Sequence, residues 1–278
     1  MSILHLKEVD LYYESIGNGN PPLVFIHGYT CDHTDWDLQV KHLRDTYQTV
    51  TCDLRGHGQS TGINTSGTIE DFASDVESLM RTLSLRGAVL IGHSMGCRVA
   101  LETYLRNPSS VTGIILFDGS RMSEGNPNAT VAAFTKSIEQ IGFQEYTRHD
   151  FAGMFLDEYD STLMDRIVAR AIKLDPQYGI RVRSSFPGWD AAKMESALSN
   201  LRIPLLVIQS TGLNENLERY SLKRGDNTSW LDLVKRLVPT ARIKIIPSHG
   251  HFIMLEAPDR TCELIISFIE KLKKNRRL

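Results

Sequence analysis

Residues 89–97 constrain the fold more than any other stretch, because an apolar, strand-like run ends there in a serine between two glycines. Residues 98–106, directly afterwards, have the pattern of a helix. A chain that turns this sharply from strand to helix has no room for side chains two residues before and after the serine, so Gly92 and Gly96 fit those positions. The turn also forces Ser94 into a strained backbone conformation and lifts its hydroxyl clear of the chain.

Strand-like and helical segments alternate along most of the chain. Residues 3–6 and 9–15 predict two antiparallel strands, and further strand-like runs lie at residues 23–26, 47–52, 88–91, 113–117, 205–208 and 242–246. Helical patterns lie at residues 35–43, 69–83, 98–106, 230–237 and 259–274. We therefore predict an α/β fold with a mostly parallel central sheet and helices on both faces.

Residues 122–200 differ from the rest of the chain, because strand-like runs are absent there. Helical patterns occur at residues 130–141, 144–155 and 161–174 and, after Pro187-Gly188-Trp189, at residues 190–198. We predict that residues 122–200 form a helical cap on a core domain made of residues 1–121 and 201–278. Residues 209–229 predict a long polar loop.

The composition argues against several classes of partner. A net charge of −2 gives no general attraction to nucleic acid or to an anionic membrane surface. No apolar run approaches the length of a membrane span, and the N-terminus lacks the pattern of a signal peptide. The four cysteines are scattered, which suits a reducing compartment. We predict a cytoplasmic protein that acts on a small molecule, as a monomer or a homodimer.

Four motifs in order resemble the α/β-hydrolase superfamily across nearly the whole chain. They are His27-Gly28, Asp53-x-Arg55-Gly56-x-Gly58-x-Ser60, Gly92-x-Ser94-x-Gly96, and Gly250-His251-Phe252 followed by Glu256 and Pro258. The resemblance implies the α/β-hydrolase fold with Ser94 as a nucleophile. It also implies an oxyanion hole formed by the backbone N–H groups of Tyr29 and Met95.

A serine of this kind needs a neighbouring base to take its proton. His251 follows the last predicted strand and matches the family's late Gly-His-Phe position, with His249 as the alternative. His93 adjoins the serine, but the sharp turn predicts that it points into the fold. His27 and His57 are interpreted as structural residues.

The acid of the triad is where the sequence departs from the common family pattern. Most members carry it in the loop after the strand that corresponds to residues 205–208, but the expected position here is Leu213. Some members place the acid one strand earlier, and Asp118 stands at that strand end, 24 residues after Ser94. We predict Asp118 as the acid, with Glu215 and Asp226 as alternatives.

The Asp53-x-Arg55 motif is better explained as a tight turn held by its own ion pair than as part of a catalytic site. The sequence has no phosphate-binding loop, no dinucleotide fingerprint and no H-E-x-x-H motif. We therefore predict neither a cofactor nor a metal.

These residues predict a serine hydrolase that cleaves a carboxylic ester, or a related acyl substrate, through an acyl-enzyme on Ser94. The predicted cap would shape a pocket for a small or medium uncharged substrate. Its predicted wall consists of Met154, Phe155 and Trp189, together with Tyr29 and Met95.

Other reactions on the same frame stay open: carbon–carbon bond hydrolysis, lactone opening and perhydrolysis. A cofactor-free dioxygenase is a further alternative. Its known examples tend to carry a histidine directly after the nucleophile position, where this chain has Met95. A small-molecule receptor with an intact hydrolase-like pocket is the alternative outside enzymes.

Overall fold

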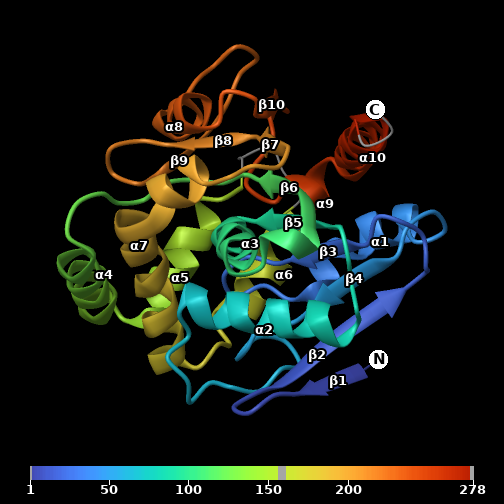
Figure 1. Ribbon diagram of the computed structural model, residues 1–278. Helices are drawn as coiled ribbons and strands as arrows, with labels where there is room; N and C mark the ends of the chain where they lie inside the picture. The colour runs from blue at the N-terminus through green and yellow to red at the C-terminus, as the bar shows by residue number, and fades with distance from the viewer. Residues whose placement is uncertain (1, 156–160, 276–278) are drawn as a thin grey trace.

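The computed structural model describes residues 2–155 and 161–275. Its main sheet has eight strands in the order β1-β2-β4-β3-β5-β6-β7-β10, and it is parallel from β4 to β10 (Figure 1). The strands are β1 Ser2–His5, β2 Asp10–Ile16, β3 Leu23–Ile26, β4 Thr49–Cys52, β5 Ala88–His93, β6 Val111–Phe117, β7 Leu205–Gln209 and β10 Arg242–Ile245. Only β1 and β2 are antiparallel to their neighbours.

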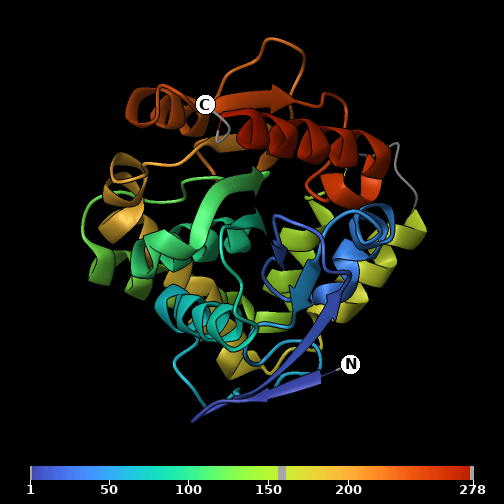
Figure 2. The same ribbon diagram turned by 45° about the vertical axis from the view of Figure 1, so that its right-hand side comes forward.

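Helices cover both faces of this sheet. Helices α2 and α3 pack together on one face, and α1 and α10 pack together on the other (Figures 1 and 2). The helices outside the insertion are α1 Asp37–Leu43, α2 Ile69–Thr82, α3 Met95–Arg106, α8 Ser229–Leu237, α9 Ile253–Glu256 and α10 Pro258–Asn275, with 3-10 turns at His33–Trp36 and Pro108–Ser110. The predicted fold class is confirmed.

The strand order places β5 among the central strands, between β3 and β6. Every residue of β3, β5 and β6 is buried, as expected for parallel strands covered on both faces. The carboxyl ends of these strands meet at one edge of the sheet, which is where ligands bind in open α/β folds. The chain segments after these strands therefore come close together.

Four helices connect β6 to β7 and lie over this edge. They are α4 Pro127–Ile141, α5 Phe143–Ala152, α6 Ser161–Ala171 and α7 Pro176–Ser199. They occupy the range predicted to be a cap, of which residues 156–160 lie outside the described residues. The division of the chain into core and cap stays a prediction.

The predicted break before residue 190 is wrong, because α7 is one helix of 24 residues that contains Pro187. A proline inside a helix removes one backbone hydrogen bond and strains the preceding turn. Extensive packing of α7 against α4 and α3 offsets this cost. Gly188 contributes to it: a Cβ atom there would lie 2.5 Å from Val131 Cγ2, so glycine lets α4 approach closely.

The segment predicted as a polar loop contains a hairpin, formed by β8 Thr211–Leu213 and β9 Arg219–Ser221. Each strand has three residues, too few to show an alternating pattern in the sequence. The ring of Tyr220 lies over Gly212, where a Cβ atom would come within 2.5 Å of the ring. The two strands therefore pair in a defined register, and the hairpin follows directly after β7, at the carboxyl edge of the main sheet.

A buried ion pair joins α7 to α3. The Arg98 guanidinium donates to both carboxylate oxygens of Asp190, at 2.7 and 2.6 Å, and both side chains are almost fully buried. Asp190 also accepts a hydrogen bond of 2.8 Å from the backbone N–H of Met122. The pair therefore joins α7 and the chain at Met122 to α3.

We expect Asp190→Ala to lower the free energy of unfolding by about 3–5 kcal/mol, because it leaves the Arg98 charge buried without a partner. Urea denaturation followed by circular dichroism measures the change. Glu195→Ala is the control, because Glu195 is an exposed carboxylate on the same helix that pairs with Arg121 and Arg236, and it should change stability by less than about 1 kcal/mol. Equal losses in the two variants would contradict the structural role of the buried pair.

Among the described residues, no helix is long and apolar enough to cross a membrane.

Candidate active site

Ser94 lies between β5 and α3 in a conformation that few residues other than glycine adopt. Its φ is 54° and its ψ is −114°, and its hydroxyl makes no capping hydrogen bond to α3. The glycines around it are required by the geometry. A Cβ atom on Gly92 would lie 2.3 Å from Gly96 O, and one on Gly96 would lie 2.4 Å from Ile26 O. The strained turn thus holds a hydroxyl that the helix does not use.

His251 and Ser94 line the same cavity, although they are 157 residues apart in the sequence. His251 Nδ1 lies 2.6 Å from Asp118 Oδ2, and both side chains are buried. Within the described residues, His251 Nε2 is buried and makes no hydrogen bond. The ring is therefore anchored through one nitrogen, and its other nitrogen is available to a proton donor in the cavity.

Asp118 follows β6 and is held by a dense set of donors. Its Oδ1 accepts hydrogen bonds of 2.8 Å from the backbone N–H groups of Ser210 and Thr211. Its Oδ2 accepts a hydrogen bond of 2.5 Å from the Thr211 hydroxyl and lies 3.3 Å from Arg219 Nη1. Burial alone would raise the pKa of Asp118, but its contacts with His251 and the charge of Arg219 outweigh burial and hold the pKa at about 2. Asp118 is therefore a carboxylate at neutral pH.

His251 is neutral at the same pH. Burial lowers the pKa of His251, and the nearby charge of Arg219 lowers it further. Asp118 opposes both effects, and the pKa lies at about 4. A neutral imidazole can take a proton, so this electrostatic setting suits a general base.

Backbone contacts fix the loop that carries His251. The His251 N–H donates to Met154 O at 2.8 Å, and His93 Nε2 lies 3.0 Å from His251 O. One residue earlier, Gly250 N donates to Glu256 at 2.6 Å and Gly250 O accepts from the Ser210 hydroxyl at 2.7 Å. His93 thus supports the loop of the predicted base and also lines the cavity, and its structural role stays a prediction.

The alternative base and acids lie away from the cavity. His249 Nδ1 lies 2.7 Å from Pro247 O. Glu215 is exposed at the hairpin turn, and Asp226 is an exposed residue that accepts a hydrogen bond from Lys223 N. The structure brings Asp118, and none of these three residues, to His251.

The predicted oxyanion turn runs from Gly28 to Cys31, where Cys31 N donates to Gly28 O at 3.3 Å. It passes directly beside the predicted nucleophile, since a Cβ atom on Gly28 would lie 3.3 Å from Ser94 Cβ. His27 stabilises the turn through Gly28 O at 2.7 Å and Leu54 N at 2.9 Å. Met95 is the first residue of α3, so its N–H has no carbonyl partner in the preceding helical turn.

The cavity around Ser94 is small, about 30 Å³. Of the residues predicted to form its wall, Tyr29 and Met154 line it, while Met95, Phe155 and Trp189 do not. Phe155 stacks behind Phe252, with ring centroids 5.2 Å apart. The Trp189 indole donates to Glu102 at 3.0 Å, because the unbroken α7 turns it toward α3. These three predictions for the wall are therefore corrected.

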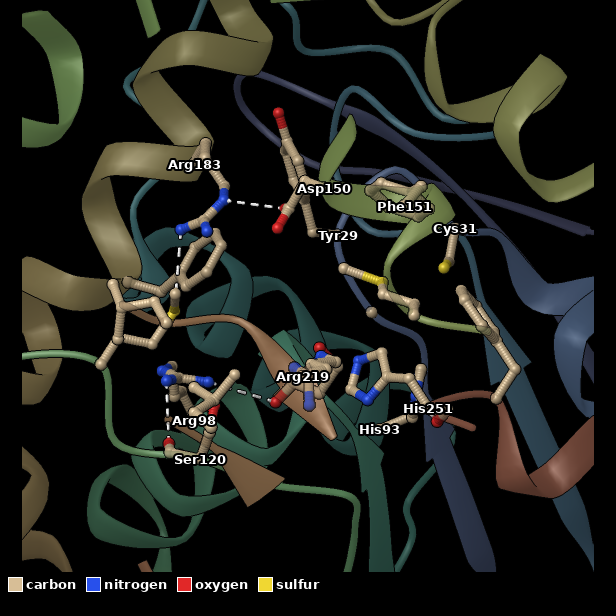
Figure 3. A pocket seen from close by; sticks show the side chains of 18 residues that line it. Tyr29, Cys31, His93, Arg98, Ser120, Asp150, Phe151, Arg183, Arg219 and His251 are labelled. Atoms are coloured by element: carbon tan, nitrogen blue, oxygen red, sulfur yellow. Dashed lines mark hydrogen bonds and ion pairs between the residues drawn. The ribbon is translucent and has the colours of Figure 1, made fainter. Parts of the chain in front are cut away.

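Sequence reasoning missed three arginines in the cavity wall, namely Arg98, Arg183 and Arg219 (Figure 3). Arg98 carried a usable signal, because a residue four positions after Ser94 lies one helical turn away from it. Arg183 belongs to α7 and Arg219 to β9, so their positions depend on elements that the sequence did not predict correctly. The charged side chains in the wall are these three arginines and Asp150.

The Asp53-x-Arg55 motif is structural, but not through its own ion pair. Arg55 pairs with Asp75 of α2 through two bonds of 2.6 Å. Asp53 instead accepts from His33 N at 2.7 Å and from Gln59 N at 2.8 Å. The predicted pair is wrong because the turn directs the guanidinium toward α2.

The described residues contain no group of three or more His, Cys, Asp or Glu side chains that could hold a metal ion.

The comparison with known proteins decides the family. The model of the alpha/beta hydrolase family matches residues 23–264. The chain belongs to the alpha/beta hydrolase family. The predicted family is confirmed, and so is the prediction that the chain is an enzyme of this hydrolase family.

Relatives of this hydrolase span nearly its whole length. A 2-(acetamidomethylene)succinate hydrolase from Mesorhizobium japonicum is 24% identical over 95% of this chain and 93% of its own. The enol-lactonase from Burkholderia xenovorans has a TM-score of 0.79 and 21% identity, with 97% of this chain and 100% of the other covered. An esterase from Exiguobacterium antarcticum has a TM-score of 0.77 and 19% identity, with 94% and 96% covered. These two solved structures show the shared fold.

Proposed function

We propose that this hydrolase cleaves carboxylic esters, including cyclic esters, through an acyl-enzyme on Ser94. The observation that carries the proposal is the arrangement of three groups: a strained serine, a neutral buried histidine facing the same cavity, and a buried carboxylate 2.6 Å from the far nitrogen of that histidine. An esterase and an enol-lactonase among the structures with the same fold support this substrate class.

The proposed reaction has two steps. His251 Nε2 takes the Ser94 proton while the Ser94 oxygen attacks the acyl carbon, and the backbone N–H groups of Tyr29 and Met95 stabilise the oxyanion. His251 then gives the proton to the leaving alcohol, and the ester bond breaks. In the second step His251 deprotonates water, which attacks the acyl-enzyme, and His251 returns this proton to the Ser94 oxygen as the acid is released. Asp118 orients the imidazole and stabilises its charged form.

We further propose that residues 122–200 act as a cap. Asp150 and Met154 belong to this range, as do Arg183 and Phe186 of α7, and all four line the cavity. A cavity of about 30 Å³ has room for only a few water molecules, so a substrate must displace part of this wall. Movement of such a cover would limit access of water to the acyl-enzyme.

A panel of p-nitrophenyl esters of increasing acyl length, together with a simple lactone, tests the proposal. We expect steady multiple turnover and a covalent fluorophosphonate adduct located on Ser94 by mass spectrometry. Binding of esters without turnover would favour a receptor, and oxygen consumption with a suitable aromatic substrate would favour a dioxygenase. Either result, with Ser94 unlabelled, would overturn the proposal.

The pH profile should reflect the unusual acidity of His251. Because the base must be unprotonated, kcat/KM for a neutral ester should stay level at neutral pH and fall as the pH drops through about 4. Arg219→Gln removes a positive charge that lowers the pKa of His251, so the acidic limb should move to higher pH. Arg181→Gln, on an exposed part of α7, should leave the limb in place. If kcat/KM of the unmodified enzyme already falls near pH 7, the lowered pKa of His251 is contradicted.

A further inference from the structure

The arginines of the cavity wall differ in how completely their charge is used. Arg98 is the more fully used, because it pairs with both oxygens of Asp190, donates to Ser120 O at 2.9 Å and, through Nη1, to Ser94 O at 3.4 Å. Arg183 has weaker polar contacts: its Nε lies 3.4 Å from Asp150 and its Nη1 lies 3.6 Å from Met122 Sδ. Both guanidinium groups are almost fully buried, with side chains 1% and 4% exposed. A buried cation with such long contacts retains donors for a ligand.

Aromatic rings hold the Arg183 guanidinium in place. Its central carbon lies 4.8 Å from the ring centroid of Phe186, 5.3 Å from Phe134 and 5.5 Å from Tyr146. Cation–π contacts use the faces of the rings and leave the N–H edge of the guanidinium for hydrogen bonding. The rings therefore orient Arg183, while its polar neighbours Asp150, Met122 and the Tyr146 hydroxyl occupy only part of its N–H donors.

Arg219 is the second arginine with unused donors. Among the described residues, its polar contacts are made by Nη1 alone, to Thr211 Oγ1 at 2.9 Å and to Asp118 Oδ2 at 3.3 Å. The side chain is 11% exposed and lines the cavity beside His251 (Figure 3). Arg183 and Arg219 thus approach the cavity from two different elements, α7 and β9.

The two arginines also separate the cavity from an outer hollow of about 760 Å³. Asp150, Arg183, Leu217 and Arg219 line both spaces, and we call these four residues the partition. The other residues of the hollow include the apolar side chains of Phe134, Ile141 and Tyr146. The acidic residues on its outer rim, Glu145 and Glu218, are exposed, and solvent screens their charge. A substrate that passes from the hollow to Ser94 must cross the partition.

We propose that Arg183 and Arg219 bind a carboxylate of the substrate at this partition, so that the enzyme selects esters or lactones bearing a second, anionic group. The inference rests on the proposed function and names its substrate class. A planar carboxylate matches the guanidinium fork and takes up the unused donors. An incoming carboxylate would compete with Asp150 for Arg183, which would open the partition where the substrate crosses it. The uncharged substrate expected from the sequence leaves both arginines without a ligand.

Two pairs of substrates of similar shape test the proposal. The first pair is the mono-p-nitrophenyl ester of glutaric acid against p-nitrophenyl valerate, with the carboxylate on the acyl side. The second is O-acetylglycolate against O-acetylglycolamide, with the carboxylate on the alcohol side. We expect a higher kcat/KM for the charged member in at least one pair. In that pair Arg183→Met should reduce the charged-to-neutral ratio about 10²-fold, because truncating one partner of a buried charge pair has a large effect.

Arg181→Met is the matched control, since Arg181 lies on the same helix and donates to Ile63 O away from the cavity. It should leave the ratio unchanged. Arg183→Lys retains the charge without the planar fork and should give an intermediate ratio, provided that circular dichroism shows the fold to be intact. A charged-to-neutral ratio near one in both pairs, or an equal fall in the Arg181 control, would overturn the inference and leave the proposed function standing.

A binding measurement separates this inference from the proposed chemistry. Glutarate titrated into the Ser94→Ala protein should bind, and the affinity should fall about 10²-fold when Arg183→Met is added. If no ester is turned over and Ser94 is not labelled, the proposed function fails, but this titration still decides the anion site. Absence of glutarate binding to Ser94→Ala would overturn the site.

Discussion

Ser94→Ala is expected to reduce kcat for p-nitrophenyl esters by about 10⁵- to 10⁶-fold, because the proposed acyl-enzyme cannot form without the hydroxyl. The fold should survive, since alanine is no larger than serine and the hydroxyl makes no capping bond to α3. Steady-state kinetics measures the loss, and mass spectrometry should show that fluorophosphonate no longer labels the protein.

Ser123→Ala is a suitable control for this experiment, because Ser123 bonds to Thr130 outside the cavity. Its turnover and labelling should match those of the unmodified enzyme. Residual ester cleavage above about one per cent in purified Ser94→Ala protein would identify another nucleophile and contradict the assignment.

The second large effect is expected from Asp118→Asn, which should lower kcat by about 10⁴-fold. The reason lies in the donors around the carboxylate. Two backbone N–H groups face Oδ1, so the amide oxygen will take that position and the NH₂ group will face His251 Nδ1. The amide would then donate to Nδ1 and force the imidazole proton onto Nε2, where it blocks acceptance of the Ser94 proton.

Glu215→Gln and Asp226→Asn provide the comparison, because both residues are exposed and stand in the loop where most family members place the acid. Their turnover should stay within about two-fold of the unmodified enzyme. Near-normal activity of Asp118→Asn together with an inactive Glu215→Gln variant would show that Glu215 of the hairpin is the acid, and would contradict the assignment of Asp118. Circular dichroism of Asp118→Asn is needed to show that the protein is folded.

The sequence predicted the parts of this fold that have strong local patterns. Strand β3 and residues 113–117 of β6 could be recognised because parallel strands buried on both faces read as nearly continuous apolar runs. Ser94 could be recognised because its turn tolerates only glycine at two flanking positions. The contact between Asp118 and His251 agrees with the pairing expected from motif order, and its catalytic role stays a prediction.

What the sequence could not predict depends on packing between distant segments. A proline usually ends a helix, so the continuity of α7 through Pro187 follows only from its contacts with α4 and α3. The orientation of Trp189 depends on that continuity. Similarly, Arg219 reaches Asp118 only because short strands pair as a hairpin, and three-residue strands give no readable period.

The position of Asp118 directly after β6 has an evolutionary consequence. In a chain with the acid after β7, an insertion or deletion in that loop would displace the acid itself. Here the corresponding chain forms the β8–β9 hairpin, whose turn at residues 214–218 supplies Leu217 to the partition and no group to the histidine. Mutations that lengthen or reshape this turn can therefore diversify substrate preference across a lineage while the contact between Asp118 and His251 is retained.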